Sequence, residues 1–153
     1  MKWIGEHIFN FIARFRNDVA IGWHGDADRI KILPRDFLGN EDATIGPVVF
    51  DDTGTLGIAV SSANTELYAF VPIPFGKKAT HVRINSDSTL NISVAESNIN
   101  ASGLTSKGTG QTNSDIDITD VSHSATNYLT IKVVATATTQ IVYGGTVTIA
   151  DIV

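Results

Sequence analysis

The first eighteen residues have a hydrophobic pattern that differs from the rest of the chain. Within residues 2–16, two isoleucines and two phenylalanines are spaced 4, 3 and 4 residues apart, which places them on one face of a helix. The sequence predicts an amphipathic helical arm over residues 1–18, whose candidate oligomer-interface residues are Trp3, Ile4, Ile8, Phe11, Ile12 and Phe15. A helix this short is marginal in isolation, so its aromatic face must be covered. The alternatives are that it packs on its own domain, on symmetry mates in a homo-oligomer or on a membrane surface. The membrane is disfavoured because the segment carries only three basic residues.

From residue 19 onward, apolar positions alternate with polar ones, which is the pattern of β-strands. The alternation predicts strands near residues 19–23, 29–33, 48–50, 56–60 and 66–71, with turns at residues 24–26 and 51–54 and a polar loop at 40–46. Two prolines then predict a rigid, extended connector over residues 72–76.

The clearest alternation follows this connector. Residues 80–85 and 90–94 are predicted to form a hairpin, and residues 128–136 and 140–149 to form a similar one with a bulge at Gly144-Gly145. Between them, residues 97–113 are polar and contain glycine, so they are predicted to be a long loop before a strand that begins at Ile116. We expect one shared core that contains Val82, Ile84, Ile92, Val94, Leu129, Ile131 and Val133.

Together these elements predict a mainly β fold, an antiparallel β-sandwich or jelly-roll-like domain of about eight to ten strands with an N-terminal amphipathic α-helix. The expected units are the arm (1–18), a β-rich segment (19–71), the Pro-rich connector (72–76) and a β-sandwich segment (77–153). The alternative is that residues 19–153 form one domain.

Composition narrows the function classes. The 153 residues suit one domain, and 42% hydrophobic with 18% charged residues fits neither a disordered chain nor a helical bundle. A net charge of −5 argues against a nucleic-acid partner. The absence of cysteine excludes disulfides, thiol nucleophiles and thiolate metal sites. No apolar run approaches the ~20 residues of a membrane span, and the N-terminal stretch does not resemble a secretory signal, so we expect no membrane partner.

The residues that could carry chemistry are few. The two candidate metal clusters are His24 with Asp26 and Asp28, and Asp115 with Asp117 and Asp120. The first lacks the downstream glutamate of a calcium loop, so a hydrogen-bonded turn is the alternative. For the second, the alternatives are a solvated sheet edge and calcium binding.

Catalytic groupings are equally sparse. Ser61-Ser62 and Ser122-His123-Ser124 lack the nucleophile elbow of a hydrolase. The adjacent Asp51 and Asp52 point to opposite faces of a strand, so a glycosidase pair would need distant carboxylates such as Asp36 or Glu66. The large amphipathic aromatics are expected to fill the core or an interface, with glycan stacking as the alternative; they are Trp3, Trp23, Tyr68, Tyr128 and Tyr143. We assign no catalytic residue, no cofactor and no metal ligand.

Several stretches of the chain are similar in amino-acid sequence to known proteins. They are KWIGEHIFNFIARFRNDV, DADRIKILPRDF (26–37), AFVPIPFGKKATHVRIN (69–85), TSKGTG (105–110) and DIDITDV (115–121). With these stretches the chain resembles the structural, tail-fibre-like proteins of marine tailed bacteriophages. The resemblance implies a homo-oligomeric virion component and supplies no catalytic residue.

The sequence therefore predicts a non-enzymatic phage virion structural protein, tail-fibre-like or another surface component, assembled in the host cytoplasm. The expected partners are further copies of the chain, with a trimer favoured, other virion proteins and a host-surface glycan. The alternatives are a carbohydrate- or receptor-binding β module and a glycan hydrolase. An exposed aromatic platform would favour the binding module, and paired carboxylates in a cleft would favour the hydrolase. A large symmetric interface would favour the structural protein.

Overall fold

The computed structural model describes residues 28–40, 48–54 and 56–152. The predicted arm and the strand at residues 19–23 lie outside these residues. Within the described ranges, the chain forms eleven β-strands and the 3-10 turn η1 (Pro34–Asp36). The strands are β1 (Arg29–Ile32), β2 (Phe37–Gly39), β3 (Val48–Asp51), β4 (Gly57–Val60), β5 (Glu66–Pro72), β6 (Lys77–Ser86), β7 (Asn91–Asn98), β8 (Ala101–Gln111), β9 (Ile116–Ser122), β10 (Asn127–Val134) and β11 (Ile141–Asp151).

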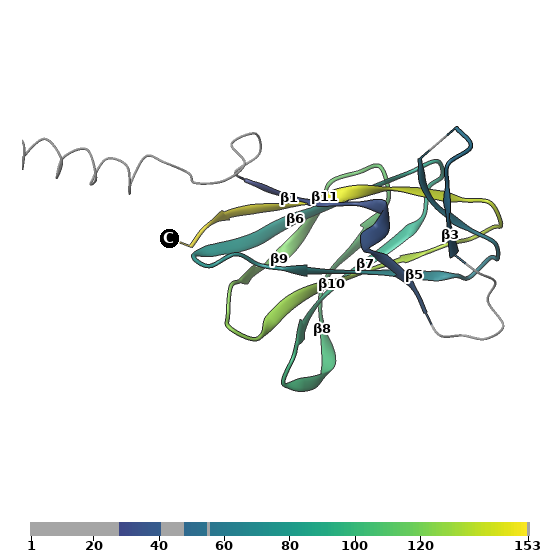
Figure 1. The fold of residues 1–153 in the computed structure, drawn as a ribbon. Helices are drawn as coiled ribbons and strands as arrows, with labels where there is room; N and C mark the ends of the chain where they lie inside the picture. Colours follow the sequence, from purple (N-terminus) through teal and green to yellow (C-terminus); the bar gives the residue numbers. More distant parts are fainter. Residues whose placement is uncertain (1–27, 41–47, 55, 153) are drawn as a thin grey trace, which may run out of the picture.

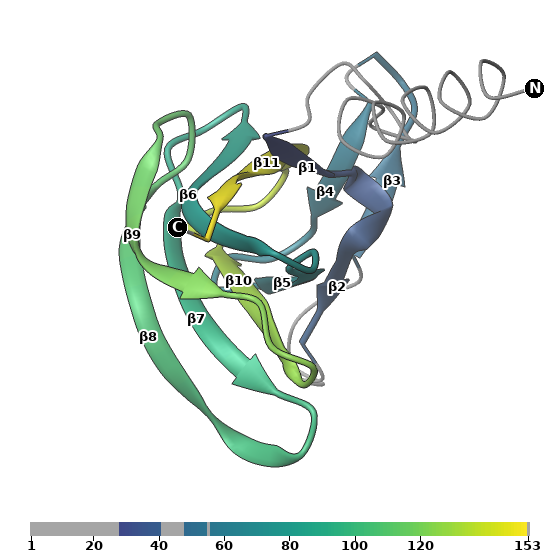
Figure 2. The same cartoon turned by 90° about the vertical axis from the view of Figure 1, so that its left-hand side faces the viewer.

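The strands form two antiparallel sheets. One has the order β3-β4-β11-β6-β9, with β1 also paired to β11, and the other has the order β2-β5-β10-β7-β8. Figure 2 shows both orders, with β9 and β8 on the left and β3 and β2 on the right. In Figure 1 the layer with β1, β11 and β6 lies above the layer with β5 and β10. The prediction of a mainly antiparallel β-sandwich is confirmed, whereas the predicted N-terminal helix lies outside the described residues.

The predicted core is confirmed. All seven aliphatic residues expected there expose 1% or less of their surface and belong to one buried cluster. Burying a side chain of this size contributes ~1.5–3 kcal/mol. A slip of one residue in register would move each set to the solvent face, so the core fixes the register of β6, β7 and β10.

Both predicted hairpins are wrong, because their strands lie in different sheets. β6 and β11 belong to the six-stranded sheet, whereas β7 and β10 belong to the five-stranded sheet. The backbone N–H of Asp87, in the β6–β7 connection, donates to the carbonyl oxygen of Ile141, and that of Leu90 donates to the Thr112 hydroxyl at 2.9 Å. Alternation identifies the buried face of a strand but not its partner, so a crossing between layers has the same pattern as a hairpin.

The segment predicted as a long loop contains β8, which pairs with β7 along the edge of the five-stranded sheet. Its alternation is hidden because two inward positions are glycines. A Cβ at Gly108 would lie 3.0 Å from the Ile118 side chain, and one at Gly110 would lie 2.7 Å from the Ile116 side chain. β9 therefore fills the space that apolar side chains of β8 would occupy.

The predicted bulge at Gly144-Gly145 is confirmed by a register shift between Val142 and Gly144 in the pairing of β11 with β6. Gly144 has φ +124°, where a side chain would be strained. A Cβ at Gly145 would overlap the carbonyl oxygen of Arg83 on β6. The bulge therefore depends on both glycines, one for its conformation and the other for the close approach of two backbones.

Both sheets draw on strands from either side of the connector at residues 72–76. β5 pairs with β10, and β1 and β4 both pair with β11. Neither part of the described chain therefore completes a sheet alone.

Candidate ligand-binding face

The candidate residues from the N-terminal arm, Trp3, Ile4, Ile8, Phe11, Ile12 and Phe15, lie outside the described residues, as do His24 and Asp26. The acidic residues of β9 and its preceding turn are described, and each lies beside a basic side chain of β6. The pairs are Lys78–Asp120 at 2.8 Å, Arg83–Asp115 at 3.6 Å and His81–Asp117 at 3.7 Å. Within the described ranges, no three His, Cys, Asp or Glu side chains gather in a way that could hold a metal ion.

The Ser122-His123-Ser124 segment serves as a structural corner between β9 and β10. The His123 ring contacts the carbonyl oxygen of Ile73 through Nδ1 at 2.8 Å, and it packs edge-on against Phe75. The Ser124 hydroxyl accepts a hydrogen bond from the Asn127 backbone at 3.1 Å. Both side chains thus hold the corner against neighbouring backbone.

The described ranges contain no helix with the length and hydrophobicity that a bilayer-spanning segment requires.

Three aromatic side chains form a platform on the outer face of the five-stranded sheet: Tyr68 and Phe70 from β5 and Tyr128 from β10. Leu67 and Leu129 point into the core, so the alternating positions on either strand point outward. Tyr68 and Phe70 lie nearly parallel with centroids 6.4 Å apart, and Phe70 and Tyr128 meet edge to face at 6.0 Å. Phe70 exposes 48% of its surface, so it presents apolar area to solvent.

The platform lies between two open grooves that share Phe70 and Tyr128. The first has a volume of about 540 Å³ and is lined by Phe70, Pro72, Ile99, Ala125, Thr126, Asn127 and Tyr128. The second, of about 420 Å³, is lined by Tyr68, Phe70, Ser97, Asn98, Ala101, Ser102, Gly103, Leu104, Tyr128 and Thr130. Part of the wall comes from the β7–β8 hairpin, which projects beyond the body of the sandwich (Figures 1 and 2). Grooves of this size accommodate a small ligand or part of a longer one.

Buried hydroxyls support the platform from below. Ser97 and Thr130 expose only 4% and 5% of their surfaces, and their hydroxyl oxygens are 2.6 Å apart. Next to them, the Asn98 amide donates to the Thr126 hydroxyl at 2.9 Å and ties β7 to the β9–β10 corner. The polar groups at the floor of the grooves are therefore held in defined positions by each other.

A charged pair holds Tyr68 at one end of the platform. Its hydroxyl donates to Glu66 at 2.7 Å, and the Lys132 ammonium donates to the same carboxylate at 3.0 Å. These two hydrogen bonds, with that to Tyr68 the stronger, lower the pKa of Glu66. Burial and the neighbouring Glu66 raise the pKa of Tyr68 to about 12, so the phenol stays neutral and donates to Glu66.

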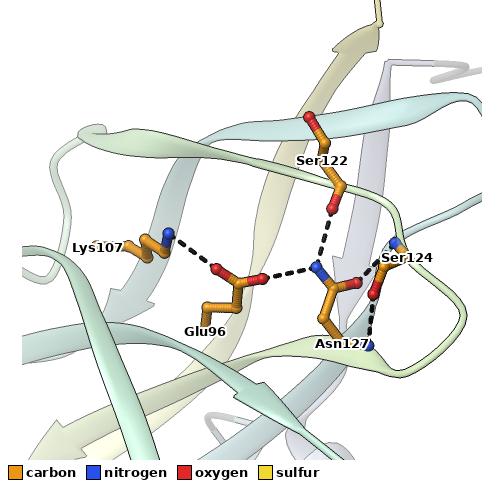
Figure 3. A network of polar contacts seen from close by, with 5 residues as sticks. All are labelled: Glu96, Lys107, Ser122, Ser124 and Asn127. Carbon is orange, nitrogen blue, oxygen red and sulfur yellow. Dashed lines mark hydrogen bonds and ion pairs between the residues drawn. The ribbon is translucent and has the colours of Figure 1, made fainter.

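A second polar network fixes the wall of the first groove (Figure 3). The Asn127 amide donates to Glu96 at 2.7 Å and to the Ser122 carbonyl at 2.9 Å, and its oxygen accepts from the Ser124 backbone at 2.9 Å. Lys107 completes the network with an ion pair to Glu96 at 2.8 Å. The hydrogen bond from Lys107, followed by that from Asn127, lowers the pKa of Glu96. The network therefore joins β7, β8 and the β9–β10 corner from the core side of the sheet, because Glu96 lies opposite the inward Leu129.

The arrangement offers binding surface rather than acid–base groups. Among the described residues that line the two grooves, none is a carboxylate, a histidine or a lysine. Sequence reasoning singled out Tyr68 and Tyr128 but missed Phe70. The signal that was available is the alternation in ELYAFVP, whose buried Leu, Ala and Val leave Tyr and Phe on the opposite face.

Comparisons with known proteins are sparse. No family model matches the chain, and no curated protein is similar to it in sequence. Among solved structures, the chain is similar to the Clostridium thermocellum N-terminal endo-1,4-β-D-xylanase 10B CBM22-1–GH10 modules complexed with xylohexaose. The identity is 16% and the TM-score 0.37, over 82% of this chain and 26% of that chain, so the protein spans about a quarter of that length. At this level the likeness assigns neither a fold nor a ligand.

Proposed function

We propose that this protein is a non-catalytic binding module whose ligand is a glycan. The observation that carries the proposal is the platform of the exposed Phe70 and the partly buried Tyr68 and Tyr128, which lines two grooves. Sugar rings present C–H groups on their faces and hydroxyls around their edges. A surface of exposed aromatic rings bordered by fixed hydroxyls and amides complements both features.

Two competing ligand classes fit this face less well. Single-stranded nucleic acid also stacks on aromatic rings, but its phosphates require a positively charged groove. Among the described residues that line the grooves there is no cation, and the chain carries a net charge of −5. A glycan hydrolase needs two carboxylates across the scissile bond, and the part of the lining that the structure describes contains none. These contrasts favour binding over hydrolysis.

The proposal is tested by titrating the full chain with soluble neutral polysaccharides in a calorimeter, after a glycan array has selected the polysaccharides. We expect Phe70→Ala to weaken binding by roughly tenfold or more, equivalent to about 1.4 kcal/mol. Phe50→Ala is the matched control, because Phe50 is 54% exposed on β3 of the other sheet. Binding that is absent for the native protein, or equally weakened by both variants, would contradict the proposal.

The resemblance to phage structural proteins supports a second proposal, a homo-oligomeric virion surface component with a trimer favoured. The two proposals are compatible, because a virion surface component that meets host-surface glycans needs a glycan-binding face. The residues expected to drive assembly are those of the predicted arm, whereas the platform lies in the β-sandwich. Assembly and glycan binding are therefore measured separately.

A further inference from the structure

We infer that the platform binds the interior of a neutral, extended glycan chain, with sugar units over Phe70 and Tyr128 and further units in both grooves. The inference rests on the proposed function and adds the charge and the binding mode of the ligand. A site for a chain end or a single sugar would be closed on one side. Here open grooves continue on both sides of the same two rings.

The spacing of the rings fits a repeating ligand. The three centroids are separated by 6.4 Å and 6.0 Å. The planes of Tyr68 and Phe70 differ by 11° and those of Phe70 and Tyr128 by 70°, so a chain that stacks on all three rings turns between Phe70 and Tyr128. The rings also follow the pairing of β5 with β10, in which Pro72 lies opposite Tyr128 and Phe70 lies opposite Thr130. A rigid pair of strands therefore holds successive stacking positions, as an oligosaccharide requires.

The absence of charge among the lining residues selects a neutral ligand. The nearest charges at the Tyr68 end, Glu66 and Lys132, lie 3.0 Å apart and neutralise each other. Glu96 lies opposite the inward Leu129, so its side chain is on the core side of the sheet, where it is paired with Lys107 at 2.8 Å. A uronate or sialic acid would lose hydration at this face without gaining a counter-ion, whereas sugar hydroxyls find hydroxyl and amide partners.

Each groove has one large exposed aliphatic residue that the other groove lacks, so the two grooves can be tested separately. Ile99 lines only the first groove and Leu104 only the second, and both are well exposed, so their truncation leaves the core intact. If a chain crosses the platform, each truncation removes contact area from a different end of the same ligand. If the site binds the end of a glycan chain, only one of the two truncations weakens binding.

The probes are the disaccharides and hexasaccharides of β-1,4-linked glucose, mannose and xylose, titrated into the full chain. We expect a hexasaccharide to bind at least tenfold more tightly than its disaccharide. Ile99→Ala and Leu104→Ala should each weaken the hexasaccharide about threefold or more and leave the disaccharide within twofold. The C6-oxidised uronate hexamers of glucose and mannose, in which a carboxylate replaces each C6 hydroxymethyl group, should bind at least tenfold more weakly.

Equal affinity for the two lengths, sensitivity to only one truncation, or uronate binding as tight as neutral binding would each overturn the inference. So would a panel in which no oligosaccharide binds. In the first three cases the proposed function stands, because the glycan still binds and Phe70→Ala still weakens it. Light scattering on the native protein and Phe70→Ala adds a separate check. A lower mass for the variant would identify the platform as a contact between subunits and overturn the inference.

Discussion

The hydroxyl pair beneath the platform offers a stringent test of how the site is supported. Thr130→Val keeps the shape of the side chain but removes its hydroxyl, which leaves the Ser97 hydroxyl buried without a partner. Because both residues are at least 95% buried and their oxygens are 2.6 Å apart, the loss should cost about 1–2 kcal/mol of unfolding free energy. Ser97→Ala should cost a similar amount, since it leaves the Thr130 hydroxyl unpaired.

The double variant separates this explanation from a loss of packing. With both hydroxyls removed, no polar group is left unsatisfied, so the double variant should be more stable than the sum of the single losses by about 1 kcal/mol. Urea unfolding followed by circular dichroism measures all four proteins. With a slope of about 1–3 kcal/mol per molar urea, a loss of about 1–2 kcal/mol should lower the midpoint by roughly 0.3–2 M. Losses that add to within about 0.5 kcal/mol would refute the reasoning.

The other predictions concern the bulge, acid stability and assembly. Gly145→Ala, whose Cβ would overlap backbone, should lose more than about 3 kcal/mol of unfolding free energy in urea. Gly108→Ala, whose closest contact would be an Ile118 methyl group at 3.0 Å, should lose less than about 1.5 kcal/mol. Equal losses would contradict this difference in steric contact. The folded-state pKa values of Glu66 and Glu96 lie below the ordinary 4.5. The stability that these two carboxylates add is therefore fully present above pH 4.5 and is lost as the pH falls through the lowered pKa values. The urea midpoint should drop on acidification, and it should drop less in the Glu66→Gln and Glu96→Gln variants. Light scattering on the native protein should give about three times the 16.4 kDa of one chain. Phe11→Asp should lower that mass, because it places a charge on the predicted apolar face of the arm. A native protein with the mass of a single chain would reject assembly.

What the sequence reveals about this fold depends on whether the information is local. The alternation in β6, β7 and β10 identified every inward residue named for the core, because the two faces of a strand are read directly from the order of residues. The bulge was also visible, since adjacent glycines in a strand mark a site where side chains do not fit. The partners of each strand were not visible, because pairing depends on residues far away in the chain.

The contrast between local and distant information also explains which parts of the candidate site could be predicted from the sequence. β8 was missed because its inward glycines, Gly108 and Gly110, are complemented by isoleucines of another strand. Tyr68 and Tyr128 were recognisable as amphipathic aromatics, but 60 residues of sequence numbering separate them and only the β5–β10 pairing brings their strands together. The grooves additionally require the β7–β8 hairpin and the β9–β10 corner. No single segment contains the site.

The place of β11 in its sheet has a consequence for how the protein is made. β11 pairs with β6 along one side and with β4 and β1 along the other, so Arg29 lies opposite Thr148. During synthesis, the earlier strands of this sheet emerge from the ribosome before the strand that joins them exists. Contacts so distant in the chain slow folding, and unpaired strand edges invite association with other chains. Until Ile141–Asp151 has been made, β1, β4 and β6 lack the strand that they share, and the pairing of β11 on both sides then closes this part of the sheet.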